Sequence, residues 1–168
     1  PWSGAPGTGN RIEGNKIGVN LAGAALGNQG AGVLLTVGAW GNTVGGAGAG
    51  NVIARNTRQG IYVIGATSVR NVISQNSIYQ NGDQGIDLSP YGVAANDPDD
   101  PDTGPNKLQN FPVMSSAVLS GGTTLTISYA VPSSTVNSLY SLAVEFFLAD
   151  AAGQEGRTYL GGESYPAA

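Results

Sequence analysis

Neither cysteine nor histidine occurs among the 168 residues of this chain. The absence of cysteine excludes disulfide bonds and thiolate metal sites, and the absence of histidine removes the commonest general base. Charged side chains are also scarce, at 11% of the residues, and the net charge is -4. Nucleic acid is therefore an unexpected partner, because a protein that neutralises a phosphate backbone needs an excess of lysine and arginine.

Long apolar runs are missing as well. No segment approaches the 18 or so apolar residues that a membrane span requires, and the amino end does not resemble a signal peptide. We therefore expect no membrane span in this chain. The chain begins with Pro1 rather than methionine, so we expect a processed or excised piece. Asparagine-linked glycans are unexpected because no N-x-[ST] sequon occurs, whereas serine- or threonine-linked glycans stay open.

Glycine is the abundant residue, at 27 of 168 positions. Such a share can indicate disorder, but aliphatic residues are spread evenly along the chain and the charge is too low for a self-repelling coil. The length suffices for one or two domains with a core. We therefore expect a folded protein with glycine-marked turns.

The pattern N-x-I-x-x-N aligns the segments that begin at Asn10, Asn51 and Asn71. A glycine followed by an aliphatic strand alternates with it, at Gly32, Gly60 and Gly85. Asn51 and Asn71 lie 20 residues apart, and a period of this size with short strands is typical of a solenoid of, here, about four coils. The alternative interpretation is an antiparallel sandwich of unrelated short strands.

Stacked coils explain why the repeat consists mainly of asparagine, glycine and aliphatic residues, with few reactive side chains. Very short strands bury an aliphatic face only when neighbouring coils continue it, so we expect Ile53, Ile61, Ile73 and Ile86 to point inward. Asparagines at one coil position would form an amide ladder that satisfies backbone groups at a corner. The predicted ladder consists of Asn10, Asn15, Asn51, Asn56, Asn71 and Asn76.

Several motifs between Gly9 and about Pro112 carry a resemblance: GNKIG, GNTVGG, GNVIARN, NVISQNSI and GIDL. With them, the sequence resembles right-handed parallel β-helix repeat proteins of the pectate-lyase-like superfamily, of the bacterial surface or secreted type. The resemblance implies an all-β fold with a short right-handed parallel β-helix over residues 1–90. It also implies an extracellular or cell-surface location in a bacterium.

The pattern changes after Leu88. Residues 91–112 are rich in proline and aspartate and predict a stiff connector. Alternating residues then predict antiparallel strands near 113–119, 123–131, 139–149 and 157–161. Residues 113–168 therefore resemble a partial immunoglobulin-like sandwich. Because a complete sandwich has about seven strands, either the chain is truncated or a neighbouring chain supplies the rest.

Two of these strands have an apolar face with no predicted partner. The side chains alternate with polar residues, which puts each set on one side of its strand. We expect these faces to take part in assembly: Leu125, Ile127 and Tyr129 on one strand, and Leu142, Val144 and Phe146 on the other.

No arrangement of residues predicts catalysis or cofactor binding. The resemblance implies clustered aspartates in the enzymes of the superfamily, but the coils here contain only scattered acids such as Asp83 and Asp87. Asp87 lies between Ile86 and Leu88 in an alternating strand, so we expect it to face solvent. Polysaccharide lyase or hydrolase activity is not expected.

The connector contains the one dense acidic run. Asp97, Asp99 and Asp102 could supply oxygen ligands for calcium, which takes six to eight oxygens, although the spacing lacks the pattern of an EF-hand. The alternative is a solvated acidic turn.

These features favour a non-enzymatic extracellular structural protein, a bacterial surface, matrix or fibre subunit that assembles head-to-tail by strand addition. Two alternatives stay open: a carbohydrate-binding or carbohydrate-cleaving β-helix, and an adhesion module of a larger surface protein.

Overall fold

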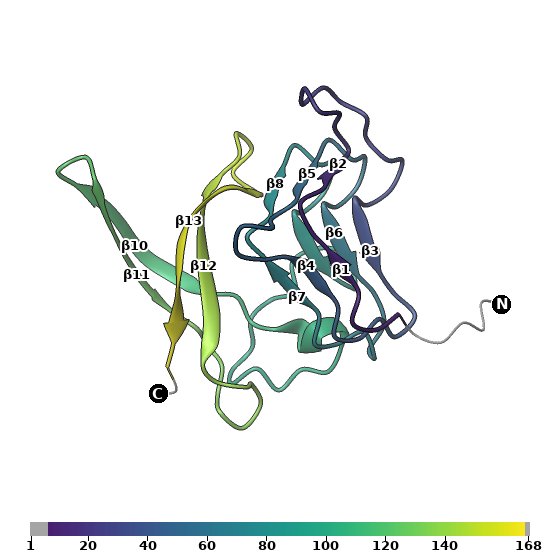
Figure 1. The fold of residues 1–168 in the computed structure, drawn as a ribbon. Helices are drawn as coiled ribbons and strands as arrows, with labels where there is room; N and C mark the ends of the chain where they lie inside the picture. Colours follow the sequence, from purple (N-terminus) through teal and green to yellow (C-terminus); the bar gives the residue numbers. More distant parts are fainter. Residues whose placement is uncertain (1–6, 167–168) are drawn as a thin grey trace.

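The chain is all-β, with short parallel strands in its first half and antiparallel hairpins in its second. The computed structural model describes residues 7–166. Figure 1 shows the short strands stacked at one side of the molecule and two longer hairpins at the other. The single helical element among the described residues is a 3-10 helix, η1 (Pro105–Leu108), in the connector.

Nine strands of two or three residues form the stacked half. We call each successive set of three a coil. Coil 1 contains β1 (Arg11–Ile12), β2 (Lys16–Ile17) and β3 (Val33–Leu35). Coil 2 contains β4 (Thr43–Gly45), β5 (Val52–Ala54) and β6 (Ile61–Val63). Coil 3 contains β7 (Val72–Ser74), β8 (Ser77–Tyr79) and β9 (Ile86–Leu88).

Each coil contributes one strand to each of three parallel sheets, ordered β1-β4-β7, β2-β5-β8 and β3-β6-β9. This arrangement is consistent with a β-helix-like repeat. The expectation of about four coils with a period near 20 was wrong. Paired residues of coils 2 and 3 lie 25 to 29 positions apart, as in Thr43–Val72, Val52–Ser77 and Ile61–Ile86. The N-x-I-x-x-N motif covers one side of a coil and not a whole coil.

The core lies inside the three sheets and is aliphatic. Ile53 and Ile61 are fully buried, and Ile73 packs against the same cluster while keeping part of its surface exposed. Ile86 continues the inward row because it pairs with Ile61, yet it is 46% exposed. The reason is its position in coil 3, beyond which no further coil covers it.

Two glycines show why the corners between strands need this residue. Gly18 and Gly45 both have φ near +85°, a conformation that other residues adopt only with strain. A Cβ on Gly45 would also lie 2.1 Å from the carbonyl oxygen of Ser74 in the next coil, and one on Gly18 would lie 1.9 Å from that of Ala54. Each glycine therefore permits both the turn and the close stacking of coils.

The second half forms two separate hairpins. Their strands are β10 (Val113–Ser120) with β11 (Thr124–Ala130), and β12 (Leu142–Ala149) with β13 (Gly156–Tyr165). All four strands lie close to the predicted positions, and both pairs are antiparallel. They do not join into one sheet: β12–β13 lies beside the stack, whereas β10–β11 projects away from it (Figure 1).

Candidate functional site

Asparagine ladders run along three corners of the stack. Each ladder links one asparagine per coil by hydrogen bonds, and the first ladder continues to Asn106 in η1. The first ladder contains Asn10, Asn42, Asn71 and Asn106; the second contains Asn15, Asn51 and Asn76; the third contains Asn28, Asn56 and Asn81.

One rung of the second ladder shows how completely the amides are used. The backbone N–H and side-chain Nδ2 of Asn51 both donate to Oδ1 of Asn76, at 3.0 and 2.8 Å. Nδ2 of Asn51 also donates back to the carbonyl of Ile12, and Oδ1 of Asn51 accepts from Asn15. Since two donors and two acceptor lone pairs are all that an amide side chain offers, Asn51 can be 1% exposed without an unpaired group.

All six predicted asparagines lie in hydrogen-bonded ladders. The alignment of Asn51 with Asn71 was wrong, because these two residues belong to different ladders. The two ends of each N-x-I-x-x-N motif sit at two successive corners, so the motif repeats within a coil as well as between coils. Sequence reasoning left four asparagines out of the ladders: Asn28, Asn42, Asn81 and Asn106. The signal for Asn81 was its position five residues after Asn76, the same spacing that separates Asn71 from Asn76.

The third ladder ends in a carboxylate. Asn81 donates its backbone N–H to Oε2 of Glu155 at 2.9 Å and its Nδ2 to Oε1 at 2.8 Å. Glu155 lies just before β13 and thus occupies the place that an asparagine would take in a further coil. Burial raises the pKa of Glu155, and the neighbouring Asp150 adds to this, whereas the hydrogen bonds from Asn81 oppose it. The hairpin β12–β13 therefore covers the end of coil 3.

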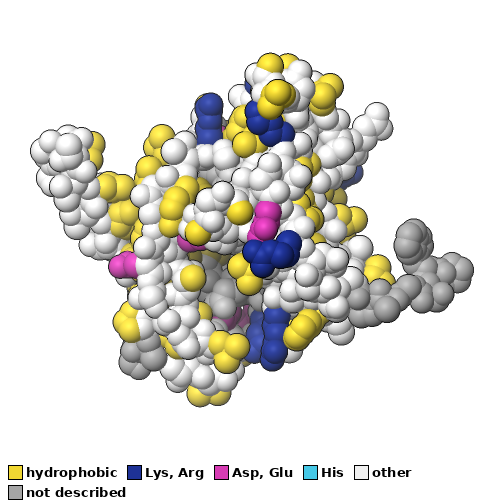
Figure 2. Space-filling view, viewed as in Figure 1, with side chains coloured by type: hydrophobic (Ala, Val, Ile, Leu, Met, Phe, Trp, Pro, Cys, Tyr) yellow, Lys and Arg dark blue, Asp and Glu magenta, His cyan; other side chains and the backbone are white. Residues whose placement is uncertain are grey.

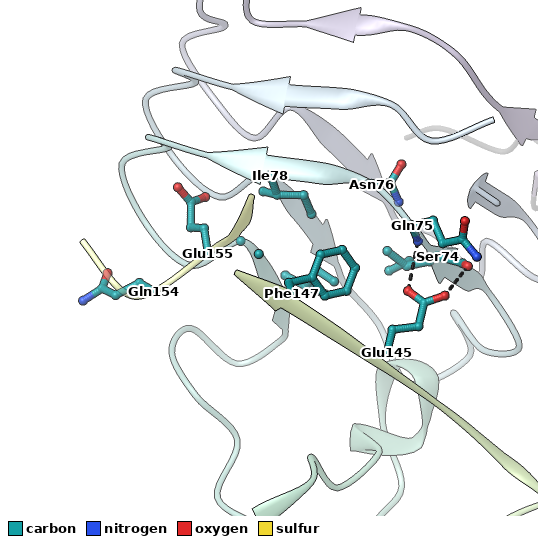
Figure 3. A pocket seen from close by; sticks show the side chains of 12 residues that line it. Ser74, Gln75, Asn76, Ile78, Glu145, Phe147, Gln154 and Glu155 are labelled. Atoms are coloured by element: carbon teal, nitrogen blue, oxygen red, sulfur yellow. Dashed lines mark hydrogen bonds between the residues drawn. The ribbon is translucent and has the colours of Figure 1, made fainter. Parts of the chain in front are cut away.

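A second carboxylate of this hairpin contacts the same end of the stack. Glu145 accepts hydrogen bonds from the backbone N–H of Gln75, at 2.9 Å, and from the hydroxyl of Ser74. Figure 3 shows Glu145 and Phe147 on one strand, with Phe147 directed toward Ile78. These side chains enclose a cavity of about 230 Å³ lined also by Ile73 and Ile86. The exposed end of the aliphatic core thus faces the hairpin across a partly filled space.

Asp87 is buried, contrary to the expectation that it faces solvent. It is 1% exposed because the chain after β9 folds back over it, with the backbone N–H of Gly92 3.4 Å from Asp87 Oδ2. Its other contact is Nε2 of Gln59, which donates to Oδ2 at 2.9 Å. Asp87 still lies on the outer row of its strand, beside Tyr62 of the coil before. The alternation in β9 thus correctly placed Asp87 on the outer side of the strand, but it did not indicate that the segment after β9 covers this side.

Aromatic and basic side chains lie over this position. The rings of Tyr62 and Tyr91 are 5.1 Å apart. The guanidinium of Arg58 lies 5.5 Å from the centre of the Tyr91 ring and donates to the Tyr91 hydroxyl at 3.0 Å. The segment that covers Asp87 is therefore anchored through Tyr91.

The acidic connector is organised around Asp100, which the predicted calcium ligand set did not include. Asp100 is 3% exposed and accepts hydrogen bonds from Gln109, Asn110, Ser133 and Ser138. It thus ties the connector to the loop between the two hairpins.

The proposed calcium ligands lie around Asp100. Asp97 and Asp99 contribute backbone groups to this network through Asn110, Ser134 and Asn137. Within residues 7–166, no group of three or more acidic side chains comes together in a way that could hold a metal ion. Calcium binding by Asp97, Asp99 and Asp102 stays a prediction, for which the test is a calcium-dependent rise in Tm.

The predicted assembly faces lie on different hairpins and meet at one end. The ring centres of Tyr129 on β11 and Phe146 on β12 are 5.3 Å apart, in an edge-to-face arrangement. The Tyr129 hydroxyl also donates to Glu163 at 2.7 Å. Burial and this carboxylate raise the pKa of Tyr129 to about 12. Val144 is 5% exposed, and Ile127 and Leu142 are half-buried.

Farther from this contact, the hairpin β10–β11 lacks cover. Every residue of β10 is exposed, and only two residues of β11 are half-buried. Leu119 pairs with Leu125 across the strands, and these side chains are 63% and 42% exposed. Figure 2 shows hydrophobic side chains along the projecting hairpin. No charged residue occurs anywhere in the segment 108–144.

Comparisons with known proteins do not assign this chain to a family. The sequence matches no protein-family model, and it has no match among curated proteins or solved structures. Within the described residues, no helix has the length and hydrophobicity needed to cross a membrane.

Proposed function

We propose that this chain is a non-enzymatic structural protein that associates with further copies of itself through the hairpin β10–β11. The observation that carries the proposal is an exposed two-stranded sheet without a charged residue on either strand. An isolated hairpin of this kind is marginally stable in water. Pairing with another strand would bury its apolar side chains and use its free backbone groups.

The absence of charge argues for a second copy as the occupant. Proteins usually protect exposed strand edges with lysine, proline, bulges or inward-pointing charges. β10 and β11 contain no charge and no proline, and their one irregularity lies near the base, between Met114 and Ser116. Two copies can therefore pair along these edges without electrostatic repulsion. Head-to-tail addition of this kind would extend into a filament unless its geometry closes a ring.

The finer fold assignments belong to the same proposal. The three stacked parallel sheets support a short right-handed parallel β-helix of the pectate-lyase-like type. The two hairpins support an immunoglobulin-like module whose remaining strands come from a neighbour. A bacterial surface, matrix or fibre subunit, located outside the cell, is the role that fits this combination.

A carbohydrate-binding role has less support from the geometry. Two exposed aromatic side chains on the stack, Trp40 and Tyr91, could stack on sugar rings. Each of them already has a guanidinium on its ring, Arg70 over Trp40 and Arg58 over Tyr91, both at 5.5 Å from the ring centre. The guanidinium thus occupies a face of each aromatic ring on which a sugar would have to stack.

Light scattering and negative-stain images of the purified chain test the proposal. The variant Leu119→Lys places a charge on an already exposed position of β10, so the monomer should tolerate it while assembly is lost. Val136→Lys is the matched control, because Val136 is 89% exposed in the loop between the hairpins. A monomeric parent protein, or assemblies that Leu119→Lys leaves unchanged, would contradict self-association through this hairpin.

A further inference from the structure

We propose that Asp87 and Gln59 form a buried binding site for one monovalent metal cation, of the size of sodium or potassium. The site lies on the outer side of the sheet β3-β6-β9, under the segment that follows β9. It is separate from the acidic connector and from the hairpin faces, and it does not depend on the proposed assembly.

The first argument is an account of hydrogen-bonding groups. Gln59 and Asp87 are each 1% exposed, and one hydrogen bond holds them together. The remaining oxygens, Oε1 of Gln59 and Oδ1 of Asp87, are buried and have no donor among residues 7–166. Buried polar atoms in folded proteins almost always have a partner. Two acceptors without one, on two side chains already in contact, indicate a missing electropositive group.

The second argument is charge. The one ion pair among the described residues joins Arg11 and Glu13, so Asp87 has no cationic side chain at ion-pair distance. The basic group over the covering segment, Arg58, is engaged with Tyr91. Burial of an unpaired carboxylate is strongly unfavourable, and a cation beside Oδ1 would offset this penalty.

The donor set indicates the class of ion. Carboxylate and amide oxygens are hard ligands and suit alkali and alkaline-earth ions. A single carboxylate balances one positive charge, so a monovalent ion leaves the buried site neutral. A divalent ion beside this single carboxylate would leave an excess positive charge in the buried site.

The covering segment gives the site a way to open. Gly92 contacts Asp87 through its backbone, and Tyr91 packs on Tyr62. Tyr91 itself is 59% exposed and is held on its outer side by Arg58. Displacement of this short segment would uncover Asp87 without separating the paired strands of the stack.

Thermal unfolding in sodium, potassium and choline chloride at equal ionic strength tests the site. We expect a saturable rise in Tm with sodium or potassium, of about 5 °C or more at one hundred times the Kd. Asp87→Asn should remove this rise. In choline chloride, Asp87→Asn should have a higher Tm than the parent, since the substitution removes an unpaired buried charge. In sodium or potassium chloride, the parent should have the higher Tm.

Asp83→Asn is the matched control, because it removes an acid from the same coil and should keep the cation effect. A crystal of the parent protein soaked in thallium or rubidium gives a readout that no variant can obscure: an anomalous peak beside Asp87 and Gln59 is expected. Equal Tm values in all three salts together with no such peak would overturn the proposal in favour of a buried water. So would a metal-ion effect that persists in Asp87→Asn.

Discussion

The two halves of this molecule bury their side chains in opposite ways. The stacked coils have strands of only two or three residues, yet the ladder asparagines of coil 2 are at most 4% exposed and hydrogen-bonded to both neighbouring coils; they are Asn42, Asn51 and Asn56. The hairpins have strands of seven to ten residues, yet most of their apolar side chains are exposed. Strand length therefore does not decide burial here; the number of partners on each side of a strand does.

The largest expected effect contrasts an aliphatic side chain from each half. Ile53→Asp should abolish cooperative unfolding, because Ile53 has no exposed surface and the carboxylate would be buried without a partner. Leu125→Asp on β11 should change the unfolding free energy by less than about 0.5 kcal/mol in the monomer. Circular dichroism during thermal unfolding measures both. If Ile53→Asp melts like the parent, the assignment of the core is wrong.

The next effect concerns the ladders. Asn51→Ala should lower the unfolding free energy by about 3 kcal/mol, because it leaves the carbonyl of Ile12 and the backbone N–H of Asn15 without the Asn51 side chain as partner. It also removes one of the two donors to Oδ1 of Asn76. Asn20→Ala is the control, since Asn20 is exposed and belongs to no ladder. Urea titrations of the two variants give the comparison. Equal midpoints would show that the ladders do not stabilise the stack.

A smaller pair of variants separates backbone strain from close packing. Gly45→Ala and Gly48→Ala both place a side chain at positive φ, of 85° and 68°. Gly48 has open space around it, whereas Gly45 faces the backbone of Ser74. We expect a loss of about 1 kcal/mol for Gly48→Ala and clearly more for Gly45→Ala, measured by urea titration. A larger loss at Gly48 would mean that coil spacing is not what requires glycine.

The smallest effect tests the cover that the hairpin provides for the stack. The pKa of Glu155 is raised in the folded state, so protonation of Glu155 adds stability that is complete below the unfolded value of 4.5 and is lost as the pH rises through the folded value. Glu155→Gln keeps an oxygen acceptor for Asn81 and removes the charge. It should therefore equal or exceed the parent in Tm at neutral pH, and the difference should shrink toward acid.

Glu155→Leu is the matched contrast. It has similar size but offers Asn81 no acceptor, so it should be less stable than Glu155→Gln at every pH. If the two variants have the same Tm, Glu155 does not replace an asparagine at the end of the third ladder.

Much of the local structure could be predicted from the sequence. The alternation around Leu125 and Val144 correctly indicated four antiparallel strands, because side chains alternate across any strand regardless of its neighbours. The repeated asparagines correctly indicated stacking of parallel strands. The length of a coil was not predictable from the motif, because Asn51 and Asn56 occupy two corners of the same coil.

The same limit applies to the sites. Nothing in the neighbours of Asp87 in sequence shows that Tyr91 and Gly92 return to cover it. Nor does the sequence around Glu155 indicate that its carboxylate accepts hydrogen bonds from Asn81, 74 residues away. The contact between Asn81 and Glu155 joins segments whose relative placement depends on the whole chain. Gly92 lies only five residues after Asp87, but no local pattern shows that the chain turns back over the strand.

By itself, the sequence determined the all-β class, the tendency of the strands to stack and the small number of reactive side chains. These properties follow from composition and from the alternation of side chains over a few residues. The tertiary structure decided which asparagines share a ladder, that Asp87 is buried and that a hairpin covers coil 3. These features depend on contacts between residues 25 or more positions apart. The physical reason is that burial and pairing of a polar group are properties of its surroundings in space, which its neighbours along the chain do not specify.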